Sequence, residues 1–346
     1  RSVFRDNSGN LWIGTMGSGL NKVNLKPKKF RHYQKKINNP FSLSENYVRA
    51  IEEDKNGNLW IGTLIGGLNR FDVKEEKFYH YKKENEYNSD FPNDNNVWSL
   101  FADNNNFLWI GTNNGLNKYN PVTKKFTYYV HDNRNKASIS DNAVRGIFQD
   151  RKGNLWIGTE GGLNKFDYQA ETFKNYIKGS GSSSISDNTI WKIIEDEQGN
   201  IWLATNDGLN RFDPYTEIFT VFTKDNNNPK SISHNGIRTL FIDKKRNLWI
   251  GTQNGLNKFD ERTETFLRFD ENNGLPNSFI YGILEDNDEN LWLSTNKGLC
   301  CFNPEVGHIR NFDVYDGLQD YEFNTNACCK TKSGEMYFAG PAGLNR

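Results

Sequence analysis

One short pattern of apolar and polar positions recurs along the whole chain. An alternating run such as residues 48–53 predicts a strand with one buried face. An Asp-x-x-Gly-Asn turn follows, and the apolar run Leu-Trp-Ile-Gly-Thr at 59–63 predicts a second strand. Residues 67–72 predict a third strand, and a Phe-x-x-Tyr pattern from Phe78 predicts a fourth. Each unit is therefore expected to form a four-stranded antiparallel sheet.

The aromatic residue of the Leu-Trp-Ile-Gly-Thr run marks the period of the repeat. Successive copies are 43 to 49 residues apart, which is the length of one propeller blade. The repeat thus predicts an all-β fold, a β-propeller of four-stranded antiparallel blades with the tryptophans packed between them. The run or a close variant begins at Leu11, Leu59, Leu108, Leu155, Ile201, Leu248 and Leu291, and Met336-Tyr337 is a degenerate eighth copy.

The chain holds eight copies of the first three strands but seven of the fourth, which bears on how the ring closes. We expect the fourth strand at Phe30 to Tyr33 to complete the blade formed by the segment from Asn326 to Asn345, because this pairing covers two open sheet edges. Residues 27–346 then form a seven-bladed propeller. Residues 1–26 are a surplus three-stranded unit, interpreted as the end of a preceding propeller. The alternative is eight blades, the last without its outer strand.

Composition narrows the partners. Lys plus Arg and Asp plus Glu are both 43, so no net field favours nucleic acid. No apolar run reaches the roughly 18 residues of a membrane span, and no membrane contact by this chain is expected. The chain begins with Arg1, which suggests a processed product or a fragment. Asn-rich runs such as 103–106 lack the spaced carboxylates of a calcium loop, so neither a metal nor a cofactor is expected.

The four cysteines form two vicinal pairs, 300–301 and 328–329, which fit no common zinc spacing. We expect them to be small residues at strand positions. A disulfide between Cys301 and Cys328 on neighbouring blades is the alternative.

The motifs Asp-x-x-Gly-Asn-Leu-Trp-Ile-Gly-Thr and Gly-Gly-Leu-Asn-Lys-Phe-Asp resemble the two-component regulator propeller family over nearly the whole chain. The stretch 317–338 is similar to the last repeat of that family. The resemblance implies a sensor region of a bacterial hybrid two-component system, in the periplasm or outside the cell. It also implies polysaccharide fragments as ligands, and signalling domains downstream that this chain does not contain. The chain would then be the membrane-proximal propeller.

One repeat position predicts a ligand site: the second residue of each innermost strand, on the face where the loops vary. Guanidinium groups and flat aromatic rings around a funnel suit an acidic oligosaccharide. The same residues could instead hold the rim together by cation–π stacking, with no ligand. The ring consists of Arg49, Trp98, Arg145, Trp191, Arg238, Tyr281 and Asn326.

We therefore predict a sensing module that binds a carbohydrate or another small ligand without catalysis. A protein-interaction or dimerisation platform, including a homodimer, is the first alternative, because Trp and Arg are frequent in protein hot spots. An enzyme is the second. A glycosidase would use acids such as Glu160 and Asp207, and a polysaccharide lyase would use His234, Tyr281 and Arg238.

Overall fold

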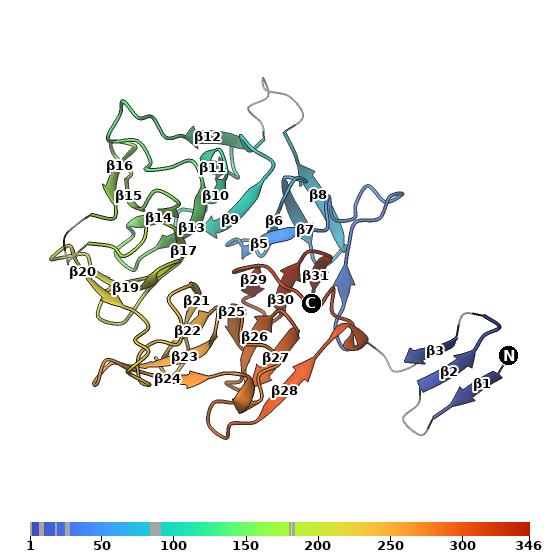
Figure 1. The fold of residues 1–346 in the computed structure, drawn as a ribbon. Coiled ribbons are helices and arrows are strands. Elements are labelled where there is room, and N and C mark those ends of the chain that lie inside the picture. Colours follow the sequence, from blue (N-terminus) through green and yellow to red (C-terminus); the bar gives the residue numbers. More distant parts are fainter. Residues whose placement is uncertain are drawn as a thin grey trace.

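The computed structural model describes residues 2–6, 10–17, 19–24, 28–83, 91–179, 181 and 184–346. Seven four-stranded antiparallel sheets follow one another around a central axis (Figure 1). The expected all-β propeller fold is confirmed.

The strand bounds follow the repeat closely. Blade 1 holds β5 (Val48–Glu53), β6 (Leu59–Thr63), β7 (Leu68–Asp72) and β8 (Lys77–Tyr81). Blade 2 holds β9 (Val97–Ala102), β10 (Leu108–Thr112), β11 (Gly115–Asn120) and β12 (Lys125–Tyr129). Blade 3 holds β13 (Val144–Gln149), β14 (Leu155–Thr159), β15 (Leu163–Asp167) and β16 (Thr172–Tyr176). Blade 4 holds β17 (Ile190–Glu195), β18 (Ile201–Thr205), β19 (Gly208–Asp213) and β20 (Ile218–Phe222).

Blade 5 holds β21 (Ile237–Ile242), β22 (Leu248–Thr252), β23 (Gly255–Asp260) and β24 (Thr265–Phe269). Blade 6 holds β25 (Ile280–Glu285), β26 (Leu291–Thr295), β27 (Gly298–Phe302) and β28 (Ile309–Phe312). Two 3₁₀ turns, η1 (Glu271–Asn273) and η2 (Val314–Asp316), precede β25 and blade 7. Blade 7 holds β29 (Cys328–Lys330), β30 (Met336–Gly340), β31 (Gly343–Asn345) and β4 (His32–Tyr33).

Blade 7 closes the ring, because it combines the last three strands, β29 to β31, with the early strand β4. Leu344 lies opposite Tyr33 and Asn345 opposite His32. The backbone groups of Arg31 and Arg346 exchange two hydrogen bonds of 2.9 Å just beyond this pair. The innermost strand β29 contacts β25 on one side and β5 on the other. The predicted composite closure of seven blades is therefore confirmed, although its outer strand is only two residues long.

The N-terminal copy forms a sheet of its own, made of β1 (Ser2–Arg5), β2 (Asn10–Gly14) and β3 (Leu20–Asn24). It lies outside the ring in Figure 1. Apolar side chains of this sheet, such as Phe4 and Leu20, are mostly exposed. The interpretation of residues 1–26 as the end of a preceding propeller stays a prediction.

In blades 1 to 6 an aspartate joins the turn after the first strand to the tryptophan of the second strand. In blade 3 one oxygen of Asp150 accepts from the Asn154 backbone N–H at 2.8 Å, and the other accepts from Trp156 Nε1 at 2.9 Å. The same Trp-to-Asp bond, 2.8 to 3.0 Å long, recurs in blades 1 to 6. The aspartate thereby fixes both the turn and the orientation of the indole ring.

Each oriented indole packs on the next blade. Trp202 of blade 4 lies in one core cluster with Ile237, Ile250 and Phe259 of blade 5. The glycine of the same strand allows the blades to approach, because a Cβ on Gly62 would lie 2.4 Å from Val97 Cγ1. The expected packing of tryptophans between blades is thus observed.

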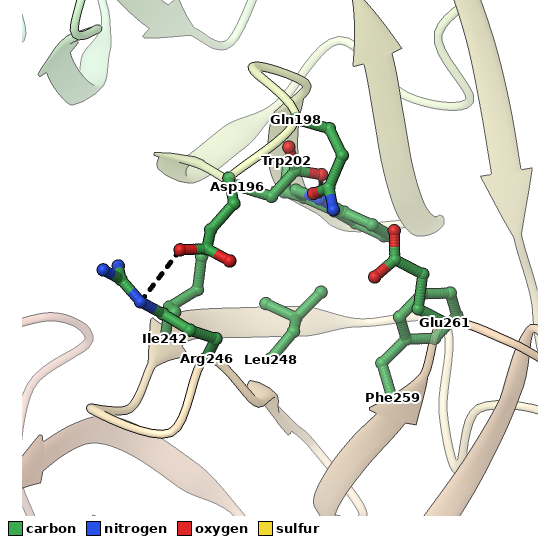
Figure 2. Close-up of a pocket in the computed structure, with 9 residues that line it drawn as sticks. Asp196, Gln198, Trp202, Ile242, Arg246, Leu248, Phe259 and Glu261 are labelled. Carbon is green, nitrogen blue, oxygen red and sulfur yellow. Dashed lines mark hydrogen bonds and ion pairs between the residues drawn. The ribbon is translucent and has the colours of Figure 1, made fainter.

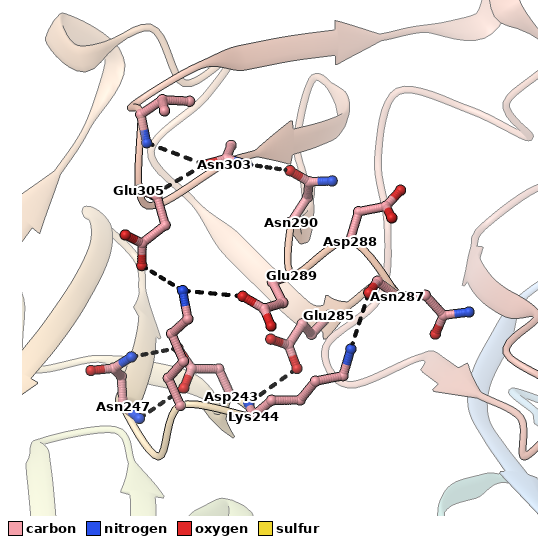
Figure 3. A network of polar contacts seen from close by, with 12 residues as sticks. Asp243, Lys244, Asn247, Glu285, Asn287, Asp288, Glu289, Asn290, Asn303 and Glu305 are labelled. Carbon is pink, nitrogen blue, oxygen red and sulfur yellow. Dashed lines mark hydrogen bonds and ion pairs between the residues drawn. The ribbon is translucent and has the colours of Figure 1, made fainter.

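Ion pairs link the turns of blades 5 and 6 on the face opposite the one where the innermost strands begin (Figure 3). Lys245 Nζ lies 2.7 Å from Glu305 and 3.1 Å from Glu289. The Lys244 backbone N–H donates to Glu285 at 3.1 Å. The two exposed ion pairs of Lys245 add little stability singly.

The four cysteines are free thiols. The disulfide between Cys301 and Cys328 is therefore not formed in this structure. Cys300 is buried on β27, at the position where other third strands carry a buried asparagine such as Asn257. This agrees with the expectation that the cysteines fill strand positions.

We expect Asp286→Asn to lower the free energy of unfolding by about 1–3 kcal/mol, because Asp286 accepts from Asn290 and Trp292. Burial raises the pKa of Asp286, but these hydrogen bonds outweigh it and hold the pKa below its ordinary value. The wild-type protein therefore loses this contribution to its free energy of unfolding as the pH falls through the folded pKa. The difference in free energy of unfolding between wild type and Asp286→Asn should narrow below about pH 4. Denaturant titrations at several pH values measure this. Asp288→Asn removes a charge from an exposed side chain of the same turn, and should change stability by less than about 0.5 kcal/mol.

Truncation tests the composite closure. Removing residues 1–34 deletes β4 and should lower the Tm, because it opens a sheet edge and uncovers the core around Tyr33. Removing residues 1–26 keeps β4, and its Tm should match that of the full chain. Equal Tm values for both truncated chains in calorimetry would contradict a closing role for β4.

Candidate functional site

A pocket of about 280 Å³ opens where the innermost strands begin, and we call it the mouth pocket. Val48, which starts the first strand, pairs with Thr63, which ends the second, so the loops before first strands and after second strands share one face. The volume is close to the lower end of ligand pockets, about 300 Å³. The lining residues are Tyr47, Arg49, Trp98, Trp191, Arg238, Phe279, Tyr281, Glu322, Phe323, Asn324 and Thr325.

β-Bulges aim the rim side chains. In blade 1, Val48 lies opposite Thr63 and Ala50 opposite Gly62, so Arg49 is an extra residue between two pairs. A bulge leaves its extra residue outside the ladder and redirects its side chain. The same register shift occurs at Trp98, Arg145, Trp191, Arg238 and Tyr281.

The redirected side chains stack on one another. The guanidinium carbon of Arg49 lies 3.4 Å from the ring centroid of Trp98, and that of Arg145 lies 3.9 Å from the same centroid. Trp191 follows at 6.2 Å from Trp98, and Arg238 lies 5.0 Å from Trp191. Cation–π contacts of this kind contribute about 0.5–2 kcal/mol each. The rim therefore stabilises itself, as the cation–π interpretation of this ring expects.

A second ring of residues holds the rim from the adjacent loops. In blades 2 to 6 it occupies the position fifteen residues after the rim residue, directly after the threonine that ends the second strand. Glu160 accepts from Arg145 Nη2 at 2.5 Å, and Asn296 accepts from the Tyr281 hydroxyl at 2.8 Å. Asn206 accepts from Trp191 Nε1 at 2.8 Å and from Arg238 Nη1 of the next blade at 3.0 Å. We call these residues the acceptor ring.

Burial shifts the pKa values of the rim groups. It lowers the pKa of Arg145 and of Arg238, although the bond to Glu160 acts against it at Arg145. Burial also raises the pKa of Tyr281 to about 12. The arginines remain cations and the tyrosine remains a neutral donor at physiological pH.

Asn326 lies beneath the mouth pocket and crosses the channel. Its side-chain amide donates to the carbonyl oxygens of Trp191 at 3.0 Å and of Arg238 at 3.1 Å, which belong to blades 4 and 5. Its φ of 57° is a left-handed conformation, which asparagine adopts more readily than most residues. Below it is an inner cavity of about 70 Å³ lined partly by Glu52 and Lys192. Burial raises the pKa of Glu52 there to about 7.

The structure brings five of the seven predicted ring residues to the mouth pocket: Arg49, Trp98, Trp191, Arg238 and Tyr281. Arg145 and Asn326 lie on the wall of the inner cavity instead. Arg145 is 9% exposed because Trp98, Glu160 and Asn113 enclose its guanidinium group. Ligand binding by the ring stays a prediction.

Sequence reasoning missed three parts of the site. Tyr47 and Phe279 directly precede the innermost strands of blades 1 and 6. The signal that could have found them is an aromatic residue at the same repeat position in both blades. The segment 322–325 belongs to the degenerate eighth copy, where the repeat register is lost. The acceptor ring was missed because its members share hydrogen-bonding capacity but not residue type.

The acids and the histidine considered for catalysis do not line the mouth pocket. Glu160 is paired with Arg145, and Asp207 accepts from the Asn235 side chain at 2.9 Å. His234 Nδ1 accepts from the Gly236 backbone N–H at 2.8 Å. Burial, together with the charges of Lys224 and Arg238, lowers the pKa of His234.

A groove of about 100 Å³ lies on the other face, between the turns of blades 4 and 5 (Figure 2). Its base is apolar, with Leu248 and Phe259, and Arg246 Nε pairs with Glu197 at 3.0 Å on one side. Asp196 and Trp202 in this groove form the repeated structural bond. Among the described residues, no group of three or more His, Cys, Asp and Glu is placed to hold a metal ion.

The repeats match a known family. The family model described as Two component regulator propeller matches residues 42–64, 92–114, 138–161, 184–207, 231–254 and 274–297. The chain belongs to the two-component regulator propeller family. Each matched regulator propeller segment contains one rim residue and the acceptor-ring position of the same blade. A comparison with curated proteins gave no match.

Solved structures share this regulator propeller fold. One is the extracellular domain of BT3049 from B. thetaiotaomicron, described as a hybrid two component system, with 27% identity and a TM-score of 0.79. The match covers 100% of this chain and 44% of that one. The extracellular domain of BT4673 from the same organism has 22% identity and a TM-score of 0.71, and the match covers 99% of this chain and 44% of that one.

Virginiamycin B lyase from Staphylococcus aureus shares the fold alone, at 14% identity. Its TM-score is 0.68, and the match covers 92% of this chain and 98% of that one. Within the described part of this regulator propeller, no helix is both long and apolar enough to cross a membrane.

Asn206→Leu tests the acceptor ring. The change leaves the N–H groups of Trp191 and Arg238 without their shared acceptor, and we expect it to lower the free energy of unfolding by about 0.5–1.5 kcal/mol. Asn206→Asp keeps an acceptor oxygen and should unfold at the same denaturant concentration as wild type. A loss of stability in the aspartate variant as large as in the leucine variant would contradict this role.

Proposed function

We propose that this chain is the ligand-binding part of an extracytoplasmic sensor, and that its mouth pocket binds a carbohydrate without converting it. The observation that carries the proposal is the chemistry of the pocket. Two indole rings, four further aromatic rings and two guanidinium groups line it within a volume of about 280 Å³. Flat aromatic faces suit the C–H faces of sugar rings, and guanidinium groups suit their oxygens.

The location of the pocket supports the same proposal. The rim belongs to a rigid ring, while the loops that lead into it differ from blade to blade in length and sequence. Such loops on a repeated scaffold determine which ligand binds. The acceptor ring holds the rim before a ligand arrives, which lowers the entropic cost of binding.

The sensing role and the location outside the cytoplasm rest on the relatives. The BT3049 structure is described as the extracellular domain of a hybrid two component system, and that of BT4673 as the extracellular domain of a one component system. This chain matches 44% of the length of each. The likeness to a lyase concerns the fold alone. Because Glu160, Asp207 and His234 are engaged elsewhere, we propose binding without turnover.

A calorimetric screen against neutral and acidic oligosaccharides tests the proposal, with product formation followed in the same samples. We expect saturable binding and no product. Trp191→Ala should weaken binding at least about tenfold, because it removes one aromatic wall of the pocket. Tyr215→Ala, an exposed aromatic residue on the strand-3 to strand-4 turn of blade 4, is the control and should bind as wild type does.

Other outcomes distinguish the alternatives. Product formation would establish an enzyme and refute the proposal. Binding that survives in the Trp191→Ala variant would place the carbohydrate site elsewhere. Absence of binding to every oligosaccharide, together with self-association that Trp191→Ala abolishes, would identify a dimerisation surface.

A further inference from the structure

The three rim arginines differ in how their charge is compensated. Arg145 pairs with Glu160 and donates to Asn113. Arg238 donates to Asn206, and the Gln253 amide oxygen accepts from it when turned toward the guanidinium group. Within the described structure, Arg49 Nε and Nη1 are buried and have no hydrogen-bond acceptor.

The sequence explains this difference. The acceptor-ring position of blade 1, fifteen residues after Arg49, is occupied by Leu64, whose side chain accepts no hydrogen bond. The carboxylate of Glu45 is engaged by the backbone N–H groups of Tyr47 at 2.9 Å and of Leu64 at 3.1 Å. Among the described residues, the contacts that remain for the Arg49 guanidinium group are cation–π contacts, with Trp98 at 3.4 Å and with Tyr47 at 5.3 Å.

A guanidinium group with two buried N–H groups and no acceptor for them favours an anionic ligand, even though the charge of Glu45 partly stabilises it. Arg49 lines the mouth pocket, and of its guanidinium nitrogens Nε and Nη1 are the two that are buried without an acceptor. Burial lowers the pKa of Arg49 to about 10, and the charge of Arg145 acts in the same direction. The group is still a cation at neutral pH, and its desolvation is costly until an oxyanion binds it.

The two ends of the mouth pocket differ in charge. Glu322 lines the pocket near Tyr281 of blade 6, and its charge raises the pKa of that tyrosine in addition to burial. The charged and polar groups that act on Arg49 are Tyr47, Arg145 and Glu45. An anionic group is therefore favoured at the end formed by Arg49 and Trp98.

We propose that Arg49 is the residue that recognises an oxyanion, so that the ligand of the mouth pocket carries a carboxylate or a sulfate at the blade 1 end. The inference rests on the proposed function of the pocket and specifies its ligand class. Arg145 and Arg238 hold the rim, and their own acceptors satisfy them.

Two variants of the full chain test the inference, each with a charge-matched control. Arg49→Gln removes the cation, and Arg134→Gln removes one from an exposed loop residue. Leu64→Glu supplies Arg49 with the carboxylate that Glu160 supplies to Arg145. Ile65→Glu adds the same charge at the next residue, which is 65% exposed and does not line the pocket.

Binding is measured by calorimetry with uronic acid oligosaccharides, sulfated oligosaccharides and their carboxyl-reduced or desulfated counterparts. We expect an acidic oligosaccharide to bind about tenfold or more tightly than its neutral counterpart. Both Arg49→Gln and Leu64→Glu should remove this preference, whereas Arg134→Gln and Ile65→Glu should keep it. Leu64→Glu should also raise the Tm of the unliganded protein, because Arg49 then gains a partner. The carboxylate and sulfate series identify which oxyanion is recognised.

The inference would be overturned if wild type bound acidic and neutral oligosaccharides with equal affinity and Arg49→Gln bound them with the same affinity as wild type. The proposed function would then still stand. If no oligosaccharide binds, the proposed function fails, and sodium sulfate titrated at constant ionic strength decides the inference. A saturable change in tryptophan fluorescence that is lost in Arg49→Gln and Leu64→Glu would support it. No response of wild type to sulfate would overturn it.

Discussion

The hydrogen bond between a turn aspartate and the indole of the following strand is the contact on which the rest of the ring depends. It joins three levels of structure in one side chain: the turn, the orientation of the tryptophan, and the packing of that tryptophan on the next blade. A buried indole N–H without an acceptor would cost free energy in every blade. Blade 7, in which Tyr337 replaces the tryptophan and bonds to Glu335, retains the arrangement only in part. That blade is also the one that needs a strand from the other part of the chain.

The fold was predictable because the same residues recur at the same positions of successive blades. The Leu-Trp-Ile-Gly-Thr run predicted the second strand of each blade, and its period predicted a propeller. The surplus of first strands over fourth strands predicted that Phe30 to Tyr33 would complete blade 7. Such evidence accumulates over many copies, so an error in one copy matters little. Two details of blade 7 differed. β4 is only two residues long, because two residues are enough to pair with the short strand β31, and β29 begins at Cys328, so Asn326 precedes the innermost strand in which it was predicted to lie.

The site was only partly predictable, because it depends on differences between copies. The second residue of the innermost strand was found by its position, but the bulge that redirects it leaves no sequence signature. Whether a rim arginine has an acceptor in its own blade depends on one residue fifteen positions later: glutamate in blade 3 pairs with Arg145, and leucine in blade 1 leaves two Arg49 nitrogens without an acceptor. Asn326 illustrates the same limit, since its bonds cross to blades that no local pattern relates to it.

The composite blade also determines how the ring responds to mechanical load. In the antiparallel pair of β4 and β31, Arg31 and Arg346 lie at the same end, and their two backbone hydrogen bonds are the outermost of the ladder. A force that separates the chain at these two residues acts on one hydrogen-bonded pair at a time, as in the opening of a zipper, and does not shear all pairs together. The seam therefore resists such a force with one hydrogen-bonded pair rather than with the whole ladder.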